Sequence, residues 1–146
     1  MMRALSTLSL GALLGVAAAE PAPTRRYVEP RMPADPRPFS DAVLVGNTLY
    51  LSGKLGLDAD RKVPAEAEQE ARNVLSDMQK TLASAGMTMD DLVFVQIFCS
   101  DVEHYTKFNE VYRTYFKKEL PARAFIGSGK LLFGARFEVQ AIAVKR

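Results

Sequence analysis

The 146-residue sequence contains no tryptophan, one histidine and one cysteine. His104 and Cys99 alone cannot supply the imidazole and thiolate ligands of a zinc cluster, and a single cysteine excludes an internal disulfide. A serine triad would have to use His104 as its base, although an exposed side chain in the first turn of a helix is its simpler interpretation. Cys99 lies in an apolar run, which favours a buried small hydrophobe over a reactive thiol.

An excess of one charge is also missing. The 19 basic residues nearly balance the 17 acidic ones, the formal net charge is +2, and no block of Lys and Arg stands out. Nucleic-acid binding proteins usually concentrate positive charge on one face or segment. The sequence therefore gives little support to a nucleic-acid partner.

No apolar run is long enough for a typical membrane span. The uncharged run 5–16 is shorter than the roughly 20 residues needed to cross a bilayer, which argues against the alternative of a membrane anchor. Arg3 precedes this run, and Ala17 to Ala19 follow it as a small-residue cleavage site. This pattern predicts a signal peptide over residues 1–19 that is cut before Glu20. We therefore expect an exported, periplasmic protein that has no membrane segment after cleavage.

Residues 20–37 form a proline-rich arm, and residues 38–146 form the predicted domain. Six of the eight prolines fall between Pro21 and Pro38, which argues against regular structure there, apart from a short strand at 26–29. Two β-rich runs, 42–45 and 48–52, flank Gly46-Asn47, a dipeptide typical of tight hairpins.

A change of period marks the first predicted helix. Apolar residues recur every three or four positions from Ala67 to Ala85, and Gly86 ends the helix. The apolar run 92–99 predicts a buried strand. Ser100 and Glu103 resemble a capping box that opens a second helix, with an apolar stripe from Tyr105 to Phe116. Two closing strands follow at 122–127 and 136–144.

The resulting order, β-β-α-β-α-β-β, predicts an α+β fold with a mixed sheet and both helices on one face. The other sheet face would be bare. We expect four strand residues to form an apolar patch there: Phe94, Phe98, Phe125 and Phe137. Exposed patches of this kind usually mark interfaces, so oligomerisation is expected.

Two segments can be compared with anion-binding sites. Gly127-Ser128-Gly129-Lys130 lacks the spacing of a phosphate loop, because Ala124 and Leu131 occupy its required positions, so a flexible connection is predicted. Arg123 opens an otherwise apolar strand. It either pairs with an acidic residue across the sheet or grips a ligand carboxylate with its planar guanidinium.

Three stretches resemble the Rid family, the reactive intermediate deaminases. They are PFSDAVLVGNTLYLSG from Pro38, NVLSDMQKTLASAGMTMDDLVFVQIFCSDVEHYTKFNEVYRTYF from Asn73, and the closing pair PAR and FEVQAIAV. The resemblance implies a chorismate-mutase-like fold and a homotrimer with clefts between subunits. It also implies hydrolysis of 2-imino acids and of enamines such as 2-aminoacrylate to 2-keto acids and ammonia, without a metal or cofactor.

The resemblance also assigns roles to residues. Arg123 would bind the substrate carboxylate, Gly53 would line the pocket with its backbone, and Asn109 would lie near the cleft. Phe39 replaces a usual tyrosine, and Ala124-Phe125 replaces a small polar residue and a cysteine, which leaves the backbone of Phe125 near the reaction. Gln140 is expected where a glutamate normally activates the attacking water.

These departures leave two further functions open. A trimer that binds small carboxylates without turnover would retain Arg123 and would explain Gln140, because an amide cannot accept the proton of water. Some members of the family are described as endoribonucleases, but the balanced charge argues against RNA as the partner.

Overall fold

The computed structural model describes residues 22–28 and 37–146. The predicted signal peptide, its cleavage site before Glu20 and most of the predicted arm lie outside the described residues. Within the described part, no helix combines the length and the apolar character needed to cross a membrane.

Six strands form one mixed sheet in the order β1-β2-β3-β6-β4-β5. Their bounds are β1 Arg25–Val28, β2 Ala42–Val45, β3 Thr48–Leu55, β4 Leu92–Cys99, β5 Ala122–Gly127 and β6 Phe137–Val144. Strands β4 and β5 are parallel, and all other neighbours are antiparallel. The predicted element order is confirmed, and the arm adds β1 one residue earlier than expected.

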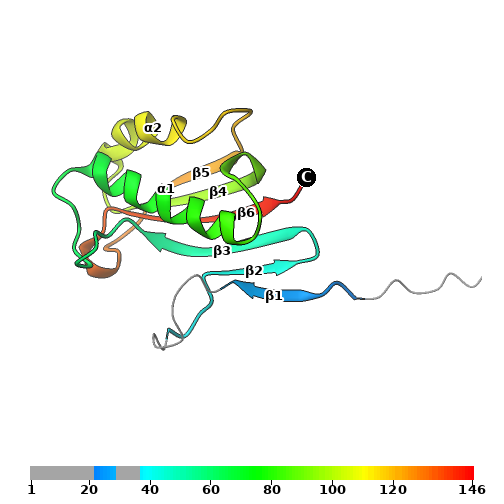
Figure 1. Cartoon of the computed structure of the whole chain (residues 1–146). Coiled ribbons are helices and arrows are strands. Elements are labelled where there is room, and N and C mark those ends of the chain that lie inside the picture. Colours follow the sequence, from blue (N-terminus) through cyan, green and yellow to red (C-terminus); the bar gives the residue numbers. More distant parts are fainter. Residues whose placement is uncertain (1–21, 29–36) are drawn as a thin grey trace, which may run out of the picture.

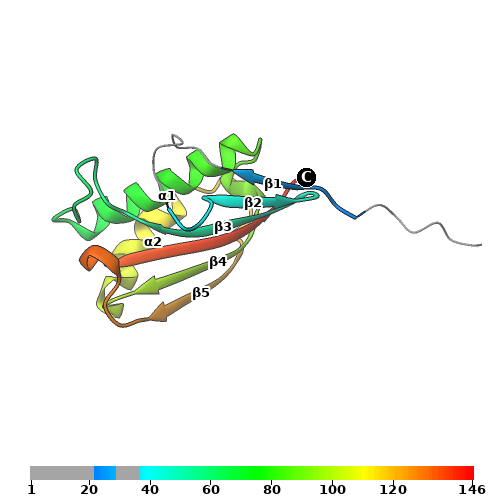
Figure 2. The same ribbon diagram turned by 90° about the horizontal axis from the view of Figure 1, so that it is seen from below.

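Both helices, α1 (Ala67–Ser84) and α2 (Tyr105–Arg113), cover the same face of this sheet (Figure 1). Figure 2 shows the opposite face, on which the strands lie side by side without a helix in front of them. This arrangement confirms the predicted α+β fold. It buries the apolar stripe of α1 against the sheet, including Val74, Leu75, Met78 and Leu82.

Two glycines account for the turns predicted from sequence. Gly46 has a φ of 59° in the β2–β3 hairpin, and Gly86 has a φ of 71° just after α1. Both values lie in the left-handed region, which glycine adopts without steric cost because it lacks a Cβ. These residues therefore fix where the hairpin turns and where the chain leaves the helix.

The start of the second helical segment differs from the prediction. Asp101, not Ser100, is the N-cap, and its carboxylate accepts a hydrogen bond from the backbone N–H of Glu103 at 3.0 Å. A 3₁₀ turn over Val102–His104 precedes α2. The helix itself ends at Arg113, so the stripe that continues to Phe116 extends beyond it.

Two of the four phenylalanines expected in an apolar patch on the helix-free face do not lie there. Phe137 is fully buried beneath the helices, with its ring 4.8 Å from that of Phe108, and Phe125 also packs against this core. Strand alternation explains the error, because residues 123 and 125 pair with the buried Val95 and Ile97. Phe94 and Phe98 point to the helix-free face, as predicted.

Candidate functional site

The larger of two candidate hollows has a volume of about 990 Å³ and surrounds the end of β3. Its walls include Phe39, Ser52, Gly53 and Glu138, together with Leu132 and Phe133 from the connection before β6. Phe39 is half exposed, whereas Glu138 is partly buried. The hollow therefore combines an apolar ring, a stretch of strand backbone and a carboxylate.

A register irregularity shapes β3 at this point. Its pairing with β6 is interrupted between Leu51 and Lys54, and Ser52 and Gly53 fall within the interruption. A Cβ placed on Gly53 would overlap Oε1 of Glu138. A side chain at position 53 would have to displace that carboxylate, so glycine lets the backbone and the carboxylate of Glu138 lie close together. Bulges of this kind often redirect side chains beside functional sites.

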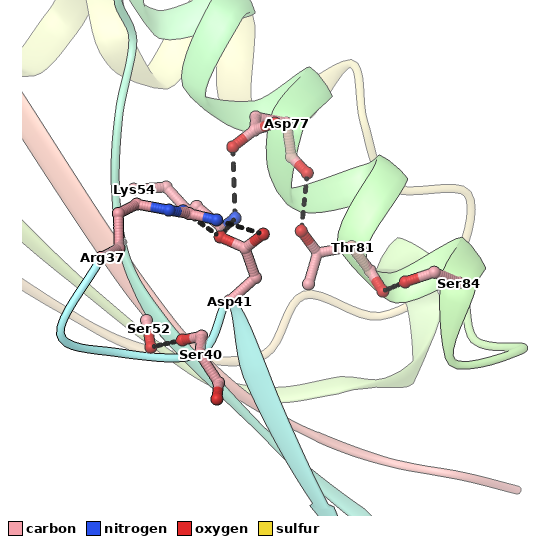
Figure 3. Close-up of polar contacts among 8 residues, drawn as sticks. All are labelled: Arg37, Ser40, Asp41, Ser52, Lys54, Asp77, Thr81 and Ser84. Atoms are coloured by element: carbon pink, nitrogen blue, oxygen red, sulfur yellow. Dashed lines mark hydrogen bonds and ion pairs between the residues drawn. The ribbon is translucent and has the colours of Figure 1, made fainter. Parts of the chain in front are cut away.

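Charged side chains that sequence analysis did not identify lie beside this bulge and also line the larger hollow (Figure 3). Lys54 Nζ lies 2.8 Å from Asp41 Oδ1 and 3.3 Å from Asp77 Oδ2, and Arg37 Nη1 lies 2.9 Å from Asp41 Oδ1. Burial by itself raises the pKa of Asp41, but hydrogen bonds and positive charge from Arg37 and Lys54 outweigh burial and lower this pKa. Asp41 is therefore held as a carboxylate.

The smaller hollow, about 170 Å³, lies at the β5 edge of the sheet, between α2 and β5. It is lined by Arg123 and Asn109 with Tyr105, Tyr112 and Pro121. Arg123 Nη1 donates a hydrogen bond to Asn109 Oδ1 at 2.7 Å. The structure therefore joins two of the predicted site residues, which are 14 positions apart in the sequence.

Three aromatic rings surround the guanidinium of Arg123. Its central carbon lies 4.9 Å from the ring centre of Tyr112, 5.8 Å from that of Tyr105 and 5.9 Å from that of Phe125. No ion pair joins Arg123 to an acidic side chain within the described residues. The alternative of a cross-sheet ion pair is therefore wrong for this part of the chain, and the cation keeps donors for a ligand.

Tyr112 cannot act as a base beside this cation at neutral pH. Burial raises the pKa of its phenol to about 12, although the charge of Arg123 acts in the opposite direction. The phenol therefore stays protonated and serves as a flat wall that orients the guanidinium.

Within one chain, the two hollows do not form a single small-molecule site. Strands β6 and β4 separate β3 from β5, so Gly53 and Arg123 lie roughly 14 Å apart across the sheet. Arg123 contacts α2 on the helix-covered face, whereas alternation along β6 directs Glu138 to the helix-free face. Within one chain, Arg123 and Glu138 therefore do not face a common pocket.

Gln140 and Phe125 line neither hollow. Gln140 is exposed on the helix-free face and donates a hydrogen bond to Gln96 Oε1 at 2.9 Å. Phe125 packs beside Arg123 and Tyr105. The carboxylate that the structure brings to Gly53 is Glu138, which sequence analysis missed. The available signal was the FEVQ alternation, which places Glu138 and Gln140 on the same face.

The contacts of the remaining candidate residues indicate structural roles. Burial raises the pKa of the Cys99 thiol, which donates a hydrogen bond to the carbonyl of Asp101. His104 is partly buried rather than exposed, because its ring packs edge-on against Phe137. The 127–130 segment connects β5 to the turn before β6, and Ser128 N–H donates to the carbonyl of Cys99. No group of three metal-ligating side chains occurs among the described residues.

Comparison with known proteins gives a consistent result. Residues 30–145 match the family model described as Endoribonuclease L-PSP. The chain is 37% identical to a mouse 2-iminobutanoate/2-iminopropanoate deaminase over 117 residues, which cover 79% of this chain and 87% of the mouse protein.

Solved structures share the fold. A Rid-family protein of unknown function from Yersinia pestis, YyfA, matches with a TM-score of 0.76 and 30% identity, over 83% of this chain and 99% of that one. Escherichia coli TdcF with bound serine matches with a TM-score of 0.76 and 25% identity, over 83% and 99%. The chain belongs to the Rid family.

Proposed function

We propose that this protein hydrolyses 2-imino acids and their enamine tautomers to 2-keto acids and ammonia, in clefts between the subunits of a homotrimer. The observation that carries the proposal is the guanidinium of Arg123, which is held by Asn109 and three rings and has no acidic partner among the described residues. A fixed, unpaired guanidinium suits a small ligand with a carboxylate.

The names of similar proteins agree with this substrate class. The mouse, bovine and human relatives are named 2-iminobutanoate/2-iminopropanoate deaminases, at 34–37% identity. The structure of Escherichia coli TdcF contains serine, which carries a carboxylate and a nitrogen on adjacent carbons, as an imino acid does. Both comparisons favour a ligand of this size.

Arg123 would bind the substrate carboxylate through two parallel N–H···O hydrogen bonds. Asn109 accepts one N–H of the guanidinium, and Tyr112 flanks its face, so the cation is oriented before the substrate arrives. A bound and oriented C=N group loses little further entropy on reaching the transition state. The contribution of Arg123 is therefore binding and orientation.

We assign the role expected of Gln140 to Glu138 of a neighbouring subunit. Its carboxylate would accept a proton from water while the oxygen attacks the carbon of the protonated imine, and the C=N electron pair moves to nitrogen to leave a neutral amine on the tetrahedral adduct. The C–N bond of the tetrahedral adduct then breaks, ammonia leaves, and the hydroxyl proton is lost to give the keto acid. Glu138 can return its proton to the departing nitrogen.

Association would complete this site. Within one chain, Arg123 lies on the edge strand β5 and faces α2, whereas Glu138 lies on the interior strand β6 and faces the helix-free side, so a second copy would supply the missing half of each site; we call the two halves the Arg123 and Glu138 half-sites. The helix-free face carries exposed or partly exposed apolar side chains, including Tyr50, Phe94, Phe98 and Ile126. Burying this face between copies would join the half-sites.

Export to the periplasm is also proposed, on the basis of residues 1–19 alone. The imine would then have to arise outside the cytoplasm, by oxidation or deamination of amino acids there. The mass of the protein recovered from the periplasmic fraction checks this proposal, since a mature chain should begin at Glu20.

The deciding experiment measures keto-acid release from 2-iminopropanoate that is generated in the cuvette. Wild type should exceed the buffer rate, and Arg123→Ala should lose about 10- to 100-fold in kcat/KM, the cost of a charge-assisted contact. The exposed Lys118→Ala is the matched control for loss of one positive charge. Wild type at the buffer rate would refute the proposal, and pyruvate binding without turnover would instead indicate a carboxylate-binding protein.

A further inference from the structure

The buried charges beside the β3 bulge require an explanation beyond stability. Asp41 is 1% exposed and Lys54 is 7% exposed, yet both are charged groups that would lose much hydration on burial. Buried ion pairs often contribute no more stability than apolar residues of similar volume would. What such a network does provide is a fixed geometry, because each charge must stay close to its partner.

The network fixes the bulge from two sides. On the side of β2, Ser52 N–H donates to the carbonyl of Asp41 at 3.1 Å, and Ser52 Oγ donates to the carbonyl of Ser40 at 2.6 Å. On the side of α1, the side chain of Lys54 bridges Asp41 and Asp77 (Figure 3). Ser52 and Gly53, which lack regular pairing to β6, are thereby held between anchored neighbours.

The same network reaches the other wall of the larger hollow. Arg37 binds Asp41, and its guanidinium carbon lies 5.3 Å from the ring centre of Phe39. Phe39 also lies two positions before Asp41 in the chain. Thus one ion network holds both the half-exposed ring and the glycine backbone that approaches Glu138.

We propose that Asp41, Lys54 and Asp77 are positioning residues, which hold the Ser52–Gly53 bulge and Phe39 in the geometry that the imine site requires. This inference rests on the proposed function and adds to it the residues that preorganise the half-site of Glu138. A one-residue slip of β3 against β6 would turn Gly53 away and direct another side chain at Glu138. The network would therefore keep β3 in the register that places Gly53 beside Glu138.

The test replaces the central pair by neutral residues of similar size, in the double variant Asp41→Asn/Lys54→Gln. The double variant removes the two most buried charges together, and Arg37 and Asp77, which each lose one partner, have side chains 23% and 26% exposed to water, so the variant should keep most of its thermal stability. We expect kcat for 2-iminopropanoate to fall about 10- to 100-fold, because small displacements at a reacting centre have effects of that size. KM should change little, because Arg123 is untouched.

A second measurement does not depend on turnover. Amide hydrogen exchange of the segment 50–56 should be faster in the double variant than in wild type, because the bulge has lost the ion pairs that Lys54 makes with Asp41 and Asp77. The matched control is Glu68→Gln/Lys107→Gln, which neutralises an ion pair of 3.4 Å between α1 and α2, away from the larger hollow. It should keep both kcat and the exchange rate of 50–56.

Asp77→Asn provides a milder variant in case the double variant does not fold. Its side chain is 26% exposed and supplies only one arm of the network, so we expect a smaller loss of kcat with the same rise in exchange. Wild-type kcat in a folded Asp41→Asn/Lys54→Gln or Asp77→Asn variant would overturn the positioning role. Inactive wild type would refute the proposed function separately, and unchanged exchange would then still refute the anchoring of the bulge.

Discussion

At the scale of single residues, we predict different effects on kcat when Glu138 and Gln140 are replaced. Glu138 lines the larger hollow beside Gly53, whereas Gln140 bonds to Gln96 on the helix-free face. Glu138→Gln keeps the size of the side chain and removes its capacity to accept a proton. We expect it to lower kcat for imine hydrolysis about 10²- to 10⁴-fold, the usual range for a lost general base.

Gln140→Ala is the comparison for this measurement, since it alters the same strand without removing the carboxylate. It should retain most of kcat in the same keto-acid assay. Equal losses in both variants would indicate damage to β6, and a loss confined to Gln140→Ala would return the catalytic role to the residue expected from sequence.

The sequence could not separate these two residues for a physical reason. A period of two places both on one sheet face, and nothing local reveals which of them meets the bulge of a distant strand. Arg123 was identifiable because a lone cation stood at the start of an apolar strand. An acidic partner for Arg123 could be excluded only from the folded structure, in which α2 brings Asn109 rather than a carboxylate within hydrogen-bonding distance of the guanidinium.

At the scale of elements, local signals predicted most of the fold. Gly46 and Gly86 lie where the hairpin and the first helix were expected to turn and end, since both depend on backbone preferences of a few residues. The ion network was not predictable in this way. Asp41 lies 13 residues before Lys54, and their pairing depends on strand register and on the docking of α1.

That network predicts how β2, β3 and α1 respond to acid. Because the folded-state pKa of Asp41 is below its ordinary value of 3.8, its ionisation stabilises the fold above that value. This contribution is lost as the pH falls through the lowered pKa. At pH 7, Asp41→Asn should lower the free energy of unfolding by about 3 kcal/mol, the scale of breaking a buried ion pair.

Urea unfolding of wild type and Asp41→Asn at pH 7, 5, 4 and 3 measures this difference. The difference in the free energy of unfolding should stay constant from pH 7 to 5 and narrow below pH 4, where the unfolded wild type begins to protonate Asp41 while the folded form keeps it ionised. A difference that widens towards acid would mean that the folded-state pKa is raised instead.

At the scale of the whole molecule, the proposed site draws its two halves from two different chains. Arg123 on β5 and Glu138 on β6 are separated by one strand, β4, and they point to opposite faces of the sheet. If a trimer brings the Arg123 half of one subunit against the Glu138 half of the next, each site contains residues from two chains. The two half-sites should then be separable by genetics.

Mixing two inactive variants tests this arrangement. Arg123→Ala and Glu138→Gln, each defective alone, are refolded together in equal amounts, and keto-acid release is compared with that of the separately refolded proteins. In randomly mixed trimers, a site is intact when its Arg123 comes from the Glu138→Gln chain and its Glu138 from the Arg123→Ala chain, which gives about one quarter of the sites. Activity should therefore recover to about one quarter of wild type. If both residues of a site came from the same chain, mixing would restore nothing, and the shared site would be refuted.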